Sequence, residues 1–76
     1  MKELVEVIAK ALVEKPEEVQ VTEESDGKHV TVKLKVDPQD MGKVIGKQGR
    51  IAKAIRSIVK AASTKDDLYV DVDIIE

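Results

Sequence analysis

The chain has no cysteine, tryptophan or phenylalanine, and its one aromatic residue is Tyr69. Without cysteine, disulfide bonds and thiolate metal sites are excluded. No apolar run approaches the roughly 20 residues that a membrane helix needs. The first six residues, MKELVE, alternate acids with apolar residues and lack the shape of a signal peptide. We therefore expect a cytoplasmic protein without a membrane partner.

The chain is also short, with 76 residues. A domain of this size buries only about 60% of the surface of its unfolded chain, which leaves little room for a deep catalytic cavity. The single histidine, His29, has no second histidine or cysteine to share a metal with. No nucleophile and base stand at a useful spacing. We expect no enzyme activity, no cofactor, no metal and no small-molecule substrate.

Charge is distributed unevenly along the chain. The formal net charge is −2. Residues 42–65 nevertheless contain seven lysines and arginines and no acid, while the remaining residues hold six bases and fifteen acids, which gives +7 against −9. A local cationic stripe indicates a polyanionic partner even when the overall charge is negative.

Apolar periodicity predicts six elements. Asp37 and Pro38 are typical of a helix start, and Asp40 is expected in the positive first turn of that helix. In the longer helix that follows, Ile51, Ile55, Ile58 and Ala62 are predicted to form the buried side. The predicted elements are a helix over 3–14, strands over 19–22 and 29–36, helices over 37–45 and 50–62, and a strand over 68–75.

Each predicted strand has one apolar face and one mostly polar face. Three helices can then cover a single side of a three-stranded sheet. The fold class is predicted as two-layer α+β, in the order α-β-β-α-α-β, within a single domain spanning residues 1–76.

A short turn, Gly46-Lys47-Gln48-Gly49, separates the two later helices; we call it the GKQG turn. Glycine directly after a helix adopts the left-handed conformation that strains other residues. Where the next helix begins, backbone amides are unpaired and the helix dipole is positive. Lys47 and Arg50 add full positive charges, so the turn is predicted to bind phosphate groups.

The segment Val44–Ile51, VIGKQGRI, resembles the helix–GxxG–helix core of KH domains, whose loop clamps about four nucleotides of backbone. The order of the elements resembles the type II KH arrangement. The run GKVIGKQGRIAKAIRSIVKAA is similar to the small bacterial single-KH proteins of the KH-domain protein A family. The resemblance implies a KH core over about residues 29–76 and a helix–strand extension over about 1–25.

The resemblance also assigns roles to residues. Gly46 and Gly49 shape the turn, while Lys47 and Gln48 project toward the sugar-phosphate backbone of RNA. Val44 and Ile45 are both candidates for an apolar groove wall, and the pattern does not say which of them faces the core. Longer-range attraction is expected from Lys43, Arg50 and Lys53.

These sequence features predict two alternative functions. The first is a single-stranded RNA-binding module of low sequence specificity, an RNA chaperone or post-transcriptional regulator. The resemblance implies partners as well: a second copy in a homodimer, or a larger multidomain KH protein involved in cell-envelope or division control. The alternative is a protein-interaction adapter whose nucleic-acid binding is vestigial.

Overall fold

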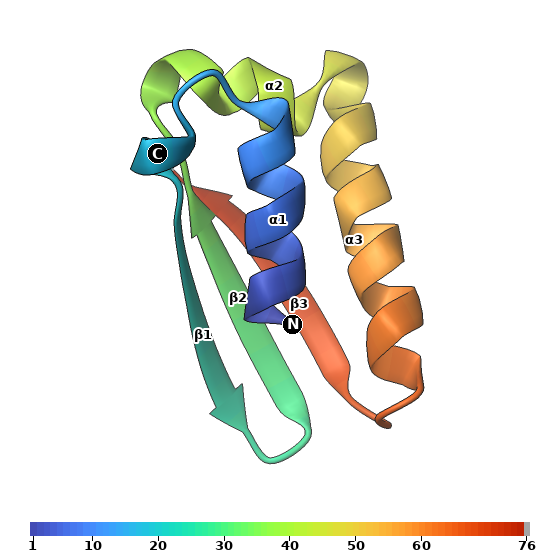
Figure 1. Cartoon of the computed structure of the whole chain (residues 1–76). Coiled ribbons are helices and arrows are strands. Elements are labelled where there is room, and N and C mark those ends of the chain that lie inside the picture. Colours follow the sequence, from blue (N-terminus) through green and yellow to red (C-terminus); the bar gives the residue numbers. More distant parts are fainter. Residues whose placement is uncertain (76) are drawn as a thin grey trace.

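The computed structural model describes residues 1–75. These residues form three α-helices in front of one three-stranded sheet (Figure 1). Single turns of 3-10 helix stand at Pro16–Glu18, Pro38–Asp40 and Lys47–Gly49. The main elements are α1 (Lys2–Leu12), β1 (Gln20–Asp26), β2 (His29–Lys35), α2 (Met41–Ile45), α3 (Arg50–Thr64) and β3 (Tyr69–Ile75). The predicted order and fold class are confirmed.

The strands lie in the order β1-β2-β3. β1 and β2 are antiparallel and joined by the two-residue turn Gly27-Lys28, where Gly27 has φ +64°. A glycine at the first position of such a turn matches the twist of the flanking strands. β3 runs parallel to β2, because α2, the GKQG turn and α3 carry the chain back across the sheet. β3 is thereby an edge strand beside α3.

The core lies between the sheet and the helices. β2 contributes three of its buried side chains, which alternate with outward-facing residues as the sequence predicts. Figure 1 shows α1 and α3 side by side across the sheet, with α2 above them. The buried apolar residues that form this core cluster are Val5, Ala9, Val21, Val30, Val32, Leu34, Val36, Val44, Ile55, Val59 and Val72.

The buried face of α3 differs from the predicted one. Ile55 is buried as expected, but the line continues through Val59 and Ser63. Ile58 is 48% exposed. Neighbouring helical positions differ by about 100° in direction, so α3 is turned about its axis by most of one residue relative to the predicted face, and Val59 replaces Ile58 in the core.

Asp40 has a role that the sequence did not reveal. It stands at the start of α2, as predicted, yet it is only 2% exposed. Its carboxylate accepts hydrogen bonds from the backbone amides of Glu14 and Lys15, at 3.3 and 3.1 Å. Asp40 thus ties the chain that leaves α1 to the start of α2, and a buried carboxylate needs such partners.

Within residues 1–75, every helix is too short or too polar to span a bilayer.

Candidate nucleic-acid interface

The GKQG turn has a backbone that few sequences can adopt. Gly46 has φ 75° and ψ 176°, a region open essentially only to glycine. Gln48 and Gly49 follow with φ 57° and 73°, both in the left-handed region. The Gly49 amide donates to the Gly46 carbonyl at 3.2 Å. The chain therefore reverses between α2 and α3 in a fixed, tight loop.

The two glycines serve different purposes. A Cβ at Gly46 would lie 2.6 Å from Cγ1 of Ile51, so this glycine permits close packing of the turn on α3. A Cβ at Gly49 would meet nothing within 4 Å. Gly49 is the N-cap of α3 and makes no side-chain capping bond. The Arg50 amide donates to the Lys47 carbonyl, and the missing side chain of Gly49 leaves space for an anion beside the positive end of α3.

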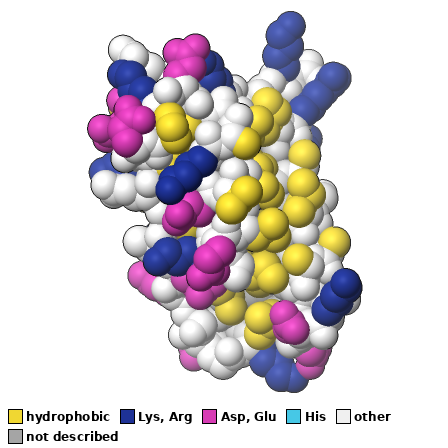
Figure 2. Space-filling model, in the orientation of Figure 1, with side chains coloured by type: hydrophobic (Ala, Val, Ile, Leu, Met, Phe, Trp, Pro, Cys, Tyr) yellow, Lys and Arg dark blue, Asp and Glu magenta, His cyan; other side chains and the backbone are white. Residues whose placement is uncertain are grey.

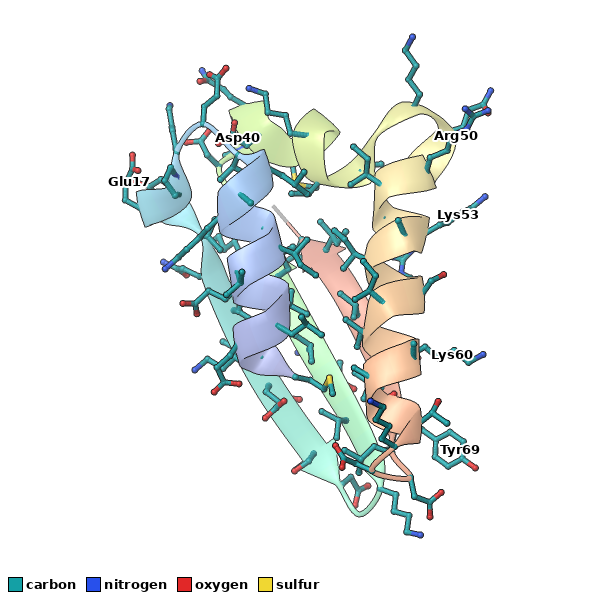
Figure 3. All side chains as sticks on the ribbon, turned by 45° about the vertical axis from the view of Figure 1, so that its right-hand side comes forward. Glu17, Asp40, Arg50, Lys53, Lys60 and Tyr69 are labelled. Atoms are coloured by element: carbon teal, nitrogen blue, oxygen red, sulfur yellow. The ribbon has the colours of Figure 1, made fainter. Side chains whose placement is uncertain are left out.

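Cationic side chains surround this corner and continue along α3. Lys47 and Gln48 are exposed at the tip of the turn. Figure 2 shows cations projecting from the corner where α2 meets α3, and Figure 3 shows Arg50, Lys53 and Lys60 pointing to one side of α3. We call Arg50, Lys53, Arg56 and Lys60 the α3 cation row.

In the part of the chain described, residues 1–75, neither Lys47 nor any member of the α3 cation row lies within 4.0 Å of a carboxylate. Arg50 has only a long 3.5 Å contact with the Gln48 side-chain oxygen. Among residues 1–75, no carboxylate neutralises these charges, so they are available to attract a polyanion.

Lys43 is in a different situation from the other predicted cations. Its Nζ lies 2.6 Å from Oε1 of Glu14 and 3.9 Å from Oδ1 of Asp40. Two carboxylates therefore compete with any phosphate for this ammonium group. The structure brings Lys43 close to the GKQG turn along α2, but its charge is already largely compensated.

Replacing Glu14 with glutamine is expected to release Lys43. We expect roughly two- to threefold tighter binding of a single-stranded oligonucleotide at low salt, because exposed ion pairs are worth only a few tenths to one kcal/mol. The gain is expected to fade at high salt. Fluorescence anisotropy of a labelled oligonucleotide measures it.

Glu17→Gln is the matched control, since it removes the same charge on the far side of the molecule from α3 (Figure 3). Equal gains from Glu14→Gln and Glu17→Gln would show that only net charge matters and that Lys43 has no special place.

Burial separates the two candidates for the groove wall. Val44 is fully buried and belongs to the core. Ile45 is only partly buried and packs on the rim of the core. Of the pair that the sequence left open, Ile45 is therefore the one with surface available to a ligand.

A groove runs along the outer edge of β3, beside α3. Two hollows of about 430 and 420 Å³ share Lys60, Val70 and Asp71 in their linings. Arg56 and Val72 line the second hollow, where Nε of Arg56 donates to the Val72 carbonyl at 3.3 Å. We call this the α3–β3 groove. Its lining residues are Thr31, Arg56, Lys60, Ser63, Thr64, Asp67, Leu68, Tyr69, Val70, Asp71, Val72 and Asp73.

Arg56 and Lys60 were not among the predicted site residues. Their charge was visible in the stripe over residues 42–65, but their position in a groove depends on β3 lying beside α3. Residues 1–75 contain no cluster of three or more metal-ligating side chains. The corner between α2 and α3 offers a helix N-terminus and cations, which suit binding of a polyanion. The groove is lined by Arg56 and Lys60 together with three aspartates, Asp67, Asp71 and Asp73.

Comparison with known proteins gives one consistent result. The family model "KhpA/KhpB, KH domain" matches residues 2–74. A protein named RNA-binding protein KhpA from Clostridium perfringens is 63% identical over 75 residues, covering 99% of this chain and 100% of the relative. A protein of the same name from Aquifex aeolicus is 47% identical over 76 residues, covering 100% of this chain and 96% of the relative. No solved structure gives a significant match.

Proposed function

The chain belongs to the KhpA/KhpB KH-domain family, and from this membership we propose that it binds single-stranded RNA by gripping the sugar-phosphate backbone with the GKQG turn. The bound strand continues along the α3–β3 groove beside the α3 cation row. Most of the contacts are to phosphate and sugar, so the module distinguishes sequences poorly. It acts as an RNA chaperone or post-transcriptional regulator.

One observation carries this proposal. The corner between α2 and α3 combines a rigid glycine turn, the positive N-terminal end of a 15-residue helix, and cations that form no ion pair within residues 1–75. Phosphate groups fit that combination better than any other common ligand. The names of the relatives, RNA-binding protein KhpA, point to the same ligand.

The test is the salt dependence of binding to a single-stranded RNA oligonucleotide. If the turn and the α3 cation row together neutralise three or four phosphates, log K falls against log salt with a slope of roughly −2 to −3, since each contact contributes about −0.7 on a single strand. Anisotropy titrations over a range of salt concentrations give the slope. A slope near zero, or no binding at low salt, would contradict the proposal.

The alternative is an adapter for protein partners with vestigial nucleic-acid binding, which the names of the relatives do not favour. The structure nevertheless has one surface suited to a protein partner. Figure 2 shows an apolar band running down the helix-covered face. Val7, Leu12 and Ile58 are exposed hydrophobic residues of α1 and α3. A homodimer would explain this band and would double the number of RNA grips, which raises affinity through avidity. Sedimentation of the purified chain distinguishes a homodimer from a monomer that needs a larger KH protein.

A further inference from the structure

Tyr69 is an exposed ring on a fixed backbone. It is the first residue of β3, and its side chain is 72% exposed. Its amide donates to the Lys28 carbonyl at 2.8 Å, and the preceding amide, that of Leu68, donates to the Ser63 carbonyl at 3.2 Å. Both ends of the local chain are therefore held, by the β1–β2 hairpin and by the end of α3. Holding the backbone lowers the entropy lost when the ring meets a ligand.

The ring stands at one end of the α3–β3 groove. It lines the hollow of about 430 Å³ together with Lys60 and Thr64 of α3, a volume in the range of ordinary ligand sites. In Figure 3, Arg50, Lys53, Lys60 and Tyr69 follow one another down the same side of α3. The 15 residues of α3 make this track roughly 22 Å long.

Two acidic residues at this end have partners on the β1–β2 hairpin. Asp67 and Asp71 also line the hollow. Asp67 lies 2.5 Å from Nζ of Lys28, and Asp71 lies 2.6 Å from Nε2 of His29. Both partners belong to the β1–β2 hairpin side. Each of these two carboxylates therefore has a basic partner on the hairpin rather than on α3.

We propose that Tyr69 is a stacking subsite for one unpaired nucleobase, at the end of the α3–β3 groove remote from the GKQG turn. This proposal rests on the proposed function, because the α3 cation row is what brings a nucleic-acid strand along the groove. Every base has a flat π face, so an exposed tyrosine accepts any of them. Phosphate contacts at the turn then fix the backbone, and Tyr69 holds a base further along the same strand.

The chain provides its own probe. Because it contains one tyrosine and no tryptophan, its intrinsic fluorescence reports on Tyr69 alone. Stacking on a base quenches tyrosine emission. We expect quenching when an eight-nucleotide oligouridine is added, in RNA or in DNA form. An otherwise identical strand in which every nucleotide is abasic keeps the phosphates and is expected to leave the emission largely unchanged.

Two substitutions complete the test. Tyr69→Leu is expected to weaken binding of the eight-nucleotide strand roughly five- to tenfold, while Tyr69→Phe retains most of the affinity. The exposure of the ring means that neither variant should unfold, and thermal melting checks this.

These experiments distinguish failure of the Tyr69 subsite from failure of the proposed RNA binding. If the oligouridine binds to the wild type while Tyr69→Leu binds equally well and emission is unquenched, the subsite is wrong and the backbone grip remains. Equal quenching by the abasic strand would also overturn stacking. So would emission that changes with protein concentration alone, because Tyr69 would then face a second copy. Absence of any oligonucleotide binding at low salt overturns both proposals.

Discussion

A variant carrying Lys47→Asp and Gln48→Asp is expected to lose RNA binding by a factor of roughly one hundred or more at physiological salt. The two substitutions change the charge at the tip of the GKQG turn by three units, from +1 to −2. Like charges that face each other across an interface cost several kcal/mol. Both side chains are exposed, and aspartate tolerates the left-handed conformation of Gln48. The fold should therefore be retained.

A matched control tests whether the change in net charge alone explains the expected loss of RNA affinity. Gln20 and Lys35 are exposed partners on neighbouring strands, on the face of the sheet away from the helices. Gln20→Asp with Lys35→Asp makes the same chemical change at that face, and we expect RNA affinity to stay within a few-fold of the wild type. Anisotropy and thermal melting compare the three proteins. If the turn variant binds RNA as well as the wild type does, the adapter function becomes the better account.

Gly46→Ala is expected to cost the most stability of any single-methyl substitution in the turn. At φ 75° and ψ 176° an alanine is strained by about 1–3 kcal/mol. Its Cβ would also lie 2.6 and 2.9 Å from side-chain carbons of Ile51, and such overpacking costs typically 1–3 kcal/mol. A combined loss of about 2–6 kcal/mol is a large part of the stability of a small domain. The melting temperature should fall by about 10 °C or more.

The other glycines of this region are natural controls. A Cβ at Gly49 meets nothing within 4 Å but φ is 73°, so Gly49→Ala should cost only the backbone strain of about 1–2 kcal/mol. Gly42 lies within α2 with open space around it and an ordinary φ. Gly42→Ala is expected to stabilise by about 0.5–1 kcal/mol. Thermal or urea unfolding measures the stability of the three variants. Equal losses of stability at all three positions would contradict the roles given to these glycines.

Local patterns in the sequence predicted the elements and the position of the turn. The eight-residue alternation from His29 gave the central strand, and Asp37 caps as expected, accepting a hydrogen bond from the Gln39 amide at 2.8 Å. The two glycines of the GKQG turn were recognisable because their conformations are set by neighbours close in sequence. Strand β1 proved longer than the segment 19–22 predicted for it, because its later residues pair with β2 although they carry few apolar side chains.

Features that depend on distant contacts were not predictable. Whether Val44 or Ile45 faces the core depends on where α2 lies over the sheet. The pairing of Lys43 with Glu14, and the bonds from Asp40 to the chain after α1, join segments more than 20 residues apart. The α3–β3 groove requires β3 to be the edge strand beside α3. A pattern of one residue type along one segment contains no information on these neighbours.

The uneven charge of the chain has a consequence for how the molecule meets a nucleic acid. With a net charge of −2, it is weakly repelled by any polyanion at long range, yet the separation of cations and acids gives it a dipole. If the chain binds RNA as proposed, that dipole is expected to turn the corner between α2 and α3 toward the strand before contact. Encounters in other orientations present acidic residues and are expected to dissociate, so the charge distribution selects the docking orientation and not the sequence that is bound.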